Sequence, residues 1–261
     1  MSHHFYYLWR QPEQDWPTKM SKAGKIRLFL LTASLLLLFS SFRLQVFIEK
    51  ISMDFGVQSL KDGQSVSMKG EIYYSSKGSK MVTHFSSPID QLIITNSGGE
   101  FKSYDSKQNT VVMDEGKDYS SKVSFVYFFI NGQIQDMGLN GLGYMLKDTR
   151  IEDKTVITTW QPRPDMGGLS ARVELVHENR QPIYMCFYNA KKKPQQKIYY
   201  SDYQKIGNFS FPMKITEFEY LPSGDSVITR RKYSNPHLNA EVPENYLNFK
   251  IPDNAKVVRQ H

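Results

Sequence analysis

Residues 88–112 read PIDQLIITNSGGEFKSYDSKQNTVV, and the Asn-Ser-Gly-Gly at 96–99 raises the choice between a phosphate loop and a hairpin. A phosphate-binding loop leads from a strand into the N-terminus of a helix. Here Gly98 and Gly99 are followed by the alternating run EFKSYD and then by the β-branched TVVM. Asn and Gly accept the positive φ angles that tight hairpin turns require. The stretch therefore predicts a β-hairpin and not a nucleotide site.

Short alternating runs separated by turn signals such as KDG, SKG and PSGD continue along the chain after residue 44. The expected strands are 46–55, 65–74, 79–86, 90–96, 100–105, 109–114, 154–160, 170–177, 182–189, 196–206, 211–221, 225–234 and 246–251. Many short strands joined by turns predict an antiparallel sheet that curls or closes. No internal repeat or low-complexity linker divides residues 44–261, so they are expected to form one β domain.

The middle of the chain departs from the strand pattern. Residues 121–148 contain apolar side chains at helical spacing and then three glycines, at 138, 141 and 143, that break any long helix. Short helices that interrupt a curled sheet can plug its mouth. Two interpretations stay open: these apolar residues complete the core, or they form a lid over a ligand cavity.

The N-terminal segment explains the charge asymmetry of the chain. Residues 1–43 contain six Lys and Arg against two acids, so they account for +4 of the formal net charge of +7. The basic run 19–27 precedes the apolar run 28–42, which has the length of a signal-peptide core and is short for a membrane span. We expect export to the periplasm, with 1–43 as a signal peptide or, through 26–42, an inner-membrane anchor. Met1 and Met20 are both possible starts.

Enzyme, metal and nucleic-acid signatures are missing from the sequence. The histidines after the N-terminal segment are too far apart for a local metal motif, and no G-x-S-x-G elbow occurs. The single cysteine, Cys186, is expected to be a small buried hydrophobe. The run AKKKP at 190–194 is typical of a solvated hairpin tip. We therefore expect a non-catalytic protein with no cofactor, no metal and no nucleic-acid partner.

Two parts of the chain, roughly 65–115 and 195–258, resemble the LolA-like family of outer-membrane lipoprotein carriers. The first has the family's order of a glycine-led strand, a proline, a glycine hairpin and a Tyr-Asp turn, at Gly70, Pro88, Gly98, Gly99, Tyr104 and Asp105. The second is similar to the closing strands and terminal F-x-x-P segment of the family, with Phe249, Ile251 and Pro252 in that place.

The resemblance implies a mainly β fold: an incomplete antiparallel β-barrel with short helices as a lid or plug. It also implies an apolar cavity that holds the acyl chains of a lipoprotein or another lipid, with membrane transport components as further partners and a monomeric protein. The abundance of Phe, Tyr and Met suits a cavity that repacks around variable chains. The family's inner strand carries an arginine that hydrogen-bonds the lid, whereas residues 78–88 contain Lys80 and His84 instead.

Side chains that line such a cavity must come from alternate positions of successive strands and from the lid. The expected lining residues are Ile72, Tyr74, Met81, Phe85, Leu92, Ile94, Phe125, Phe128 and Phe129. A register error of one residue would reverse the facing of a whole strand. The alternative interpretation is an envelope sensor or scaffold that uses the same domain while anchored through 26–42.

Overall fold

The computed structural model describes residues 48–167 and 170–258. The chain divides into two compact units, 1–45 and 46–261, and the described residues belong to the second. The expected signal peptide or anchor, the start site and the boundary at residue 44 lie outside the described residues. No helix within 48–167 or 170–258 is long and apolar enough to cross a membrane.

The described residues form fourteen strands, one α-helix and four 3-10 helices. The strands are β1 (Lys50–Lys61), β2 (Gln64–Ser75), β3 (Lys80–Ser87), β4 (Gln91–Thr95), β5 (Glu100–Asp105), β6 (Thr110–Glu115), β7 (Tyr144–Glu152), β8 (Thr155–Pro162), β9 (Arg172–Glu178), β10 (Gln181–Tyr188), β11 (Pro194–Ile206), β12 (Phe209–Tyr220), β13 (Ser226–Leu238) and β14 (Lys256–Val258). The helices are α2 (Phe125–Ile130) and the 3-10 turns Lys77–Ser79, Lys117–Tyr119, Ser121–Val123 and Asn239–Glu241.

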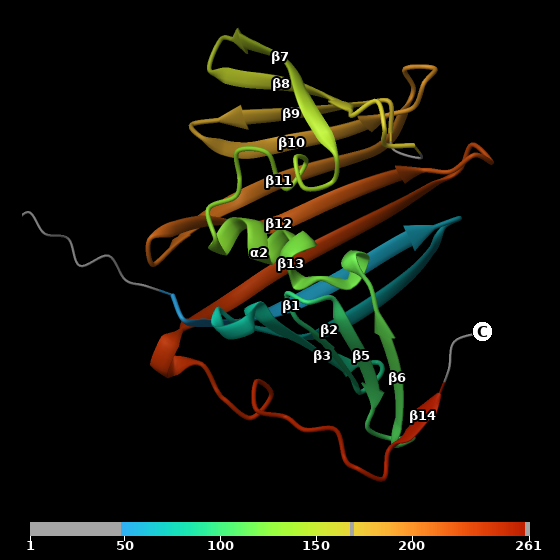
Figure 1. Cartoon of the computed structure of the whole chain (residues 1–261), viewed down its shortest axis with the longest axis vertical. Coiled ribbons are helices and arrows are strands. Elements are labelled where there is room, and N and C mark those ends of the chain that lie inside the picture. Colours follow the sequence, from blue (N-terminus) through green and yellow to red (C-terminus); the bar gives the residue numbers. More distant parts are fainter. Residues whose placement is uncertain (1–47, 168–169, 259–261) are drawn as a thin grey trace, which may run out of the picture. The chain divides into compact units, whose positions relative to one another are not determined.

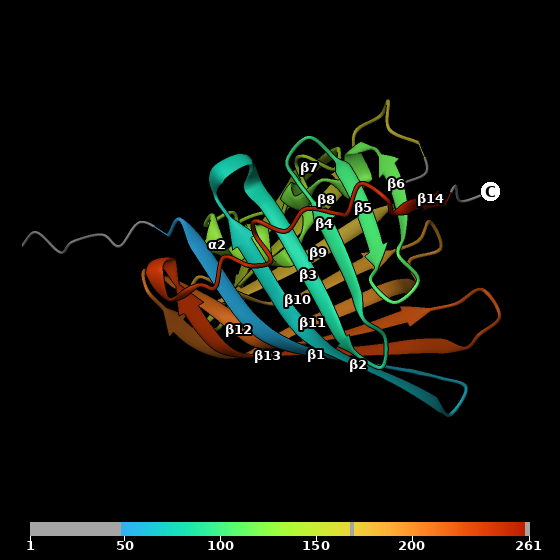
Figure 2. The same ribbon diagram turned by 90° about the horizontal axis from the view of Figure 1, so that it is seen from below.

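All of these strands belong to one sheet, in the order β14-β6-β5-β4-β3-β2-β1-β13-β12-β11-β10-β9-β8-β7. Most neighbours follow one another in the chain, but β1 pairs with β13 and β14 pairs in parallel with β6. The strands β14 and β7 are the two edges, so the sheet is open, and it curves around α2 (Figures 1 and 2). The expected mainly β fold, an incomplete antiparallel barrel, is confirmed.

Strands β2 and β3 carry apolar side chains on both faces of the sheet, because successive residues of a strand point in opposite directions. The inner face is the one on which α2 packs, and it includes Ile72, Tyr74 and Met81. The outer face carries Tyr73 and Val82. The C-terminal segment after β13 runs along this outer face across β3, β4 and β5 (Figure 2). Burying a Leu, Ile or Phe side chain fully contributes about 1.5–3 kcal/mol to folding stability. The helix α2 on the inner face and the C-terminal segment on the outer face therefore both stabilise the sheet.

Three segments differ from the expected strands. Residues 246–251 form turns and irregular backbone, and Phe249 packs on Tyr104 with ring centroids 5.7 Å apart. Strand β7 begins inside 121–148, and β14 has no counterpart among the expected strands. Strand β7 was not expected because it is an edge strand in which only Tyr144 is buried, so its sequence shows no apolar alternation. The three residues of β14 are strand only because β6 pairs with them.

The turn between β4 and β5 is the hairpin predicted at Gly98 and Gly99. The side chain of Asn96 accepts hydrogen bonds from the backbone N–H groups of Gly98, at 2.8 Å, and Glu100, at 3.3 Å. Gly99 has a φ of +89°, and a Cβ placed there would lie 2.3 Å from the carbonyl oxygen of Gly116. A Cβ at Gly98 would meet only the Asn96 side chain, at 3.2 Å. Only the second glycine is therefore required by the backbone.

We expect Gly99→Ala to lower the free energy of unfolding by more than about 1 kcal/mol, because the substitution adds positive-φ strain and a backbone clash. Gly98→Ala is the matched control and should cost clearly less. Denaturant unfolding of the two variants measures the difference. Equal losses for both would show that the turn geometry is not the cause.

Candidate functional site

The inner face is the candidate binding surface, and a separate segment, residues 116–143, covers it (Figure 1). We call this stretch the cover segment. Its helix α2 begins after Ser124, whose side chain accepts a hydrogen bond from the backbone N–H of Tyr127 at 3.1 Å. It ends at Asn131, which donates to the carbonyl of Tyr127 at 3.0 Å. A helix of six residues is marginal by itself, so its packing on the sheet holds it in place.

Aromatic rings make the contact between the cover segment and the sheet. Phe129 is buried, and its ring meets those of Tyr200, Tyr203 and Phe211 at centroid distances of 5.8, 6.2 and 5.4 Å. The three pairs have edge-to-face geometry, which contributes about 0.5–1.5 kcal/mol per pair beyond area burial. Tyr127 packs in the same way on Tyr74, at 6.2 Å. The cover segment thus contacts β2, β11 and β12 through rings.

Individual hydrogen bonds attach the cover segment to the sheet, in place of a strand ladder. Ser121 bonds through its N–H to the carbonyl of Asn96 at 3.0 Å and through Oγ to the carbonyl of Ser79 at 2.6 Å. The amide of Asn131 donates to the Tyr74 hydroxyl at 3.2 Å. Nε2 of His177 lies 2.7 Å from the carbonyl oxygen of Ile134. Such attachments break one by one, which makes this segment a candidate lid.

A polar group lies on the inner face beside the apolar cluster. Arg231 of β13 forms a salt bridge with Glu217 of β12 at 2.7 Å, and Gln196 donates to the same carboxylate. The guanidinium carbon of Arg231 lies 6.0 Å from the ring centre of Phe125 in the cover segment. Arg231 is thus an inner-face arginine beside the cover segment. It was not expected from the sequence, because the resemblance points to residues 78–88 for such an arginine.

No sequence signal separates Arg231 from Arg230, since both are arginines in the same strand. The strand pairing determines which arginine points to the inner face: Arg231 lies opposite the fully buried Ile215, whereas Arg230 lies opposite Thr216.

A buried phenol lies next to the Arg231–Glu217 ion pair, where burial raises the pKa of the Tyr200 hydroxyl well above its ordinary value. This hydroxyl has no hydrogen-bond partner among the described residues. The inner face therefore combines a large apolar area with one ion pair and a buried phenol.

The structure brings most of the expected cavity residues together. Ile72, Tyr74, Met81, Phe128 and Phe129 are buried in one cluster on the inner face. Phe125 packs against the same cluster. Phe85 is half-buried, and its ring lies 5.5 Å from that of Phe55, which also packs on this cluster. Contact of these side chains with a lipid is still a prediction.

Leu92 and Ile94 are on the wrong face for the expected cavity. In the pairing of β3 with β4, Val82 lies opposite Ile94 and His84 opposite Leu92. Val82 is an outer-face residue, so Leu92 and Ile94 belong to the outer face as well. The reason is the register set by the turn between β3 and β4, which sequence alternation within β4 alone does not reveal.

The inner face is filled by the protein's own side chains in this arrangement. Leu139 of the cover segment and Val173, Leu175, Phe211 and Ile215 of the sheet are completely shielded from solvent. A Cβ at Gly138 would lie 2.3 Å from Cζ of Phe128, so the chain around α2 is tightly packed. Any ligand on this face would therefore require the cover segment to move.

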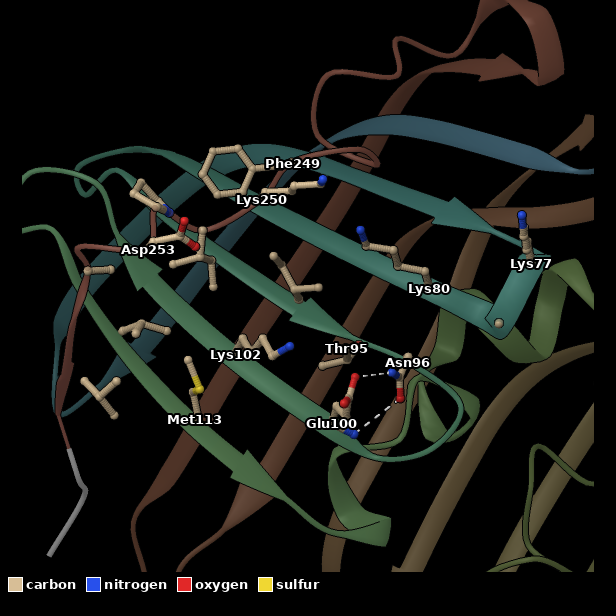
Figure 3. A pocket seen from close by; sticks show the side chains of 17 residues that line it. Lys77, Lys80, Thr95, Asn96, Glu100, Lys102, Met113, Phe249, Lys250 and Asp253 are labelled. Carbon is tan, nitrogen blue, oxygen red and sulfur yellow. Dashed lines mark hydrogen bonds between the residues drawn. The ribbon is translucent and has the colours of Figure 1, made fainter.

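An open groove lies on the opposite side of the sheet, between strands β3 to β6 and the C-terminal segment (Figure 3). Its volume is about 720 Å³, and Ile94 is one of its lining residues. Within the described parts of the chain, no group of three or more His, Cys, Asp and Glu side chains could hold a metal ion. Cys186 is completely buried, as expected of a small hydrophobe.

Comparisons with known proteins identify the fold. No protein-family model and no curated protein matches the chain. Among solved structures, a DUF1329 family protein from Desulfovibrio piger has a TM-score of 0.53 at 16% identity, covering 78% of this chain and 91% of its own. A LolA superfamily protein from Nitrosomonas europaea has a TM-score of 0.50 at 11% identity, covering 76% and 90%. A Vibrio parahaemolyticus domain named for outer membrane lipoprotein sorting has a TM-score of 0.53 at 12% identity, and the match covers 77% of this chain and 89% of that domain. The chain has the LolA-like fold.

His177 makes the stability of the folded chain sensitive to pH. Burial lowers the pKa of His177 below its ordinary value of 6.5, and the hydrogen bond to Ile134 opposes this shift only in part. As the pH falls, the unfolded chain therefore takes up this proton first. The stability that neutral His177 contributes is present above about pH 6.5 and is lost as the pH falls through the folded pKa.

We expect the pH-dependent part of the stability to disappear in His177→Gln, because glutamine keeps an N–H donor but does not titrate between about pH 5 and about pH 7.5. The melting temperature of the wild type should fall more than that of the variant between about pH 7.5 and about pH 5. Thermal unfolding at several pH values tests this. Parallel curves for the two proteins would contradict the assignment.

Proposed function

We propose that this protein is a non-catalytic carrier that binds the acyl chains of a lipoprotein or another lipid on the inner face of its sheet. The observation that carries the proposal is that an aromatic segment outside the sheet covers this apolar face. Side-chain packing and single hydrogen bonds hold that segment, residues 116–143. The LolA-like fold and the name of the lipoprotein-sorting neighbour support the same reading.

The free energies of the covered and the cargo-bound state are expected to be close to each other. An acyl chain gains about 0.8 kcal/mol for each methylene that it buries. The closed protein already buries Phe128 and Phe129 on the same surface, so the incoming chain replaces one apolar contact by another. The cover segment therefore competes with cargo, and the small difference between the two states permits both loading and release.

Arg231 is proposed as the polar attachment of the cover. Its cation–π contact with Phe125 contributes about 0.5–1 kcal/mol at a partly exposed site, and Glu217 holds the guanidinium in place. Opening moves Phe125 away from Arg231 and leaves the salt bridge intact. This role is analogous to that of the lid-bonding arginine implied by the resemblance, but the residue comes from β13.

We place the carrier in the periplasm as a monomer, exported by residues 1–43 and meeting membrane transport components as donor and acceptor. The domain of residues 44–261 would contain the whole binding function. Retention of residues 26–42 in the mature protein would instead make the same domain an anchored sensor or scaffold. N-terminal sequencing of the mature protein separates these two arrangements.

The test of cargo binding uses a fluorescent diacylated lipopeptide. Phe85→Asp places a charge on the half-buried part of the inner face, where water can reach it, so we expect a modest loss of stability but loss of lipopeptide binding. The matched control is Val66→Asp, which introduces the same charge at a position 60% exposed on β2. Binding and melting temperature are measured for both.

A wild type that binds no lipopeptide, or a folded Phe85→Asp protein that binds it as well as Val66→Asp does, would refute the carrier proposal. Unfolding of Phe85→Asp would move the test to Phe85→Ser, which removes the ring without adding a charge.

The attachment of the cover segment is tested by removing one hydroxyl group. Tyr74→Phe deletes the acceptor for the Asn131 amide and keeps the ring that packs on Tyr127. We expect a loss of about 0.5–1.5 kcal/mol in the free energy of unfolding and faster lipopeptide uptake in stopped-flow fluorescence. Tyr73→Phe is the control, since it deletes the outer-face hydroxyl that bonds Glu71. Equal uptake rates in the two variants would argue against the cover as a lid.

A further inference from the structure

The outer-face groove is a built cavity that is separate from the inner face. Strands β3 to β6 form one side of the groove, and the C-terminal segment around residues 249–257 forms the other side (Figure 3). Its volume of about 720 Å³ falls within the range of about 300–1,000 Å³ that small-molecule sites occupy. The two sides are fixed to each other, because β14 pairs with β6 and the ring of Tyr246 stacks on that of His84 with centroids 4.5 Å apart.

The strand side of this groove mixes apolar and polar side chains. Met113, Lys102, Ile94 and Val82 lie opposite one another in a row across β6, β5, β4 and β3. Met113 is 50% exposed, and Val257 on the other side is 56% exposed. The C-terminal segment leaves Met113 exposed, whereas it packs near Val82 and Ile94 in the outer-face cluster. We call the apolar lining residues Ile94, Met113 and Val257 the apolar strip, and exposed apolar side chains in a groove mark ligand-binding sites.

Four lysines surround the apolar strip: Lys77, Lys80, Lys102 and Lys250. Two acids, Glu100 and Asp253, also line the groove, so its formal charge is positive. Glu100 is engaged by the amide of Asn96 at 2.6 Å. Within residues 48–167 and 170–258, none of the four lysines forms a salt bridge with a carboxylate. The positive charges of these lysines are therefore not neutralised by an ion pair among the described residues.

Lys80 and Lys102 are the pair most suited to an anion. Figure 3 shows both side chains over the groove, from strands β3 and β5, which flank β4. Lys80 is partly buried and donates to the carbonyl of Leu247 at 2.5 Å. Burial lowers the pKa of Lys80, and the positive charge of Lys102 lowers it further. An anion between two ammonium groups that repel each other would stabilise both.

We propose that this groove binds one anionic single-chain amphiphile, with its carboxylate or phosphate headgroup at Lys80 and Lys102 and its tail along Ile94, Met113 and Val257. This site is distinct from the acyl-binding inner face. Apolar surface and positive charge occur here side by side, which fits a ligand that has both characters. A diacylated cargo does not suit it, because the strip is a single row of side chains.

The first test compares two probes of equal chain length on the purified protein: a fluorescent long-chain fatty acid and the corresponding fatty alcohol. We expect the acid to bind about ten-fold more tightly, the effect of one charge-assisted hydrogen bond. A lysophosphatidic acid of the same chain length shows whether a phosphate headgroup is preferred to a carboxylate. Inorganic phosphate alone should fail to displace either probe, since the tail supplies the apolar contact.

Variants then locate the site. Lys102→Gln and Met113→Glu should each weaken fatty-acid binding about ten-fold without a change in melting temperature, because both positions are on the surface of the groove. Lys107→Gln is the control, an exposed lysine in the turn between β5 and β6 that does not line the groove. Phe85→Asp shows whether any of the fatty acid binds on the inner face instead.

Four results would overturn the proposal: equal affinity for the acid and the alcohol, wild-type affinity in Lys102→Gln, displacement of the probe by inorganic phosphate alone, or loss of fatty-acid binding in Phe85→Asp but not in Met113→Glu. The last of these would assign the amphiphile to the inner face and would leave the carrier proposal intact.

Discussion

The pairing of β1 with β13 is the constraint on which the rest of the structure depends. These strands lie more than 160 residues apart in the chain, yet their antiparallel register runs from Ile51 opposite Leu238 to Lys61 opposite Val227. The pairing joins the half-sheet β1 to β6 to the half-sheet β7 to β13. The entropic cost of closing such a long loop grows only slowly with its length, and two long strands of hydrogen bonds and side-chain contacts offset it. Without this junction there would be no common inner face.

The cover segment depends on the same junction, because it contacts both halves of the sheet. Tyr127 packs on Tyr74 of β2, and Phe129 packs on Phe211 of β12. A short helix with four buried side chains gains its stability only when both surfaces are presented together. The result is a core closed by a segment that is packed and yet not part of the sheet. That combination suits a surface whose cover is exchanged for cargo.

Strand alternation gives the two faces of the sheet different chemistry. In β2 and β3 the neighbours Tyr73 and Tyr74, and likewise Met81 and Val82, belong to different clusters. The inner face is almost entirely apolar around α2, with Arg231 and Glu217 as an ion pair. The outer face combines an apolar strip with lysines that form no salt bridge with a carboxylate of the described residues. A single sheet can therefore present a covered apolar surface on one side and an open amphipathic groove on the other.

The sequence by itself determined the mainly β fold, the glycine hairpin and the aromatic segment in the middle of the chain. These features are local: alternation, turn chemistry and helical spacing act within about ten residues. The same local signals placed Ile72, Tyr74 and Met81 correctly on one face with Phe128 and Phe129. Only the tertiary structure decided that Leu92 and Ile94 lie on the other face, that Arg231 meets the cover segment, and that β7 and β14 are strands. Register between strands and the pairing of distant segments depend on contacts that local alternation does not specify, because one residue of slip exchanges the two faces of a strand.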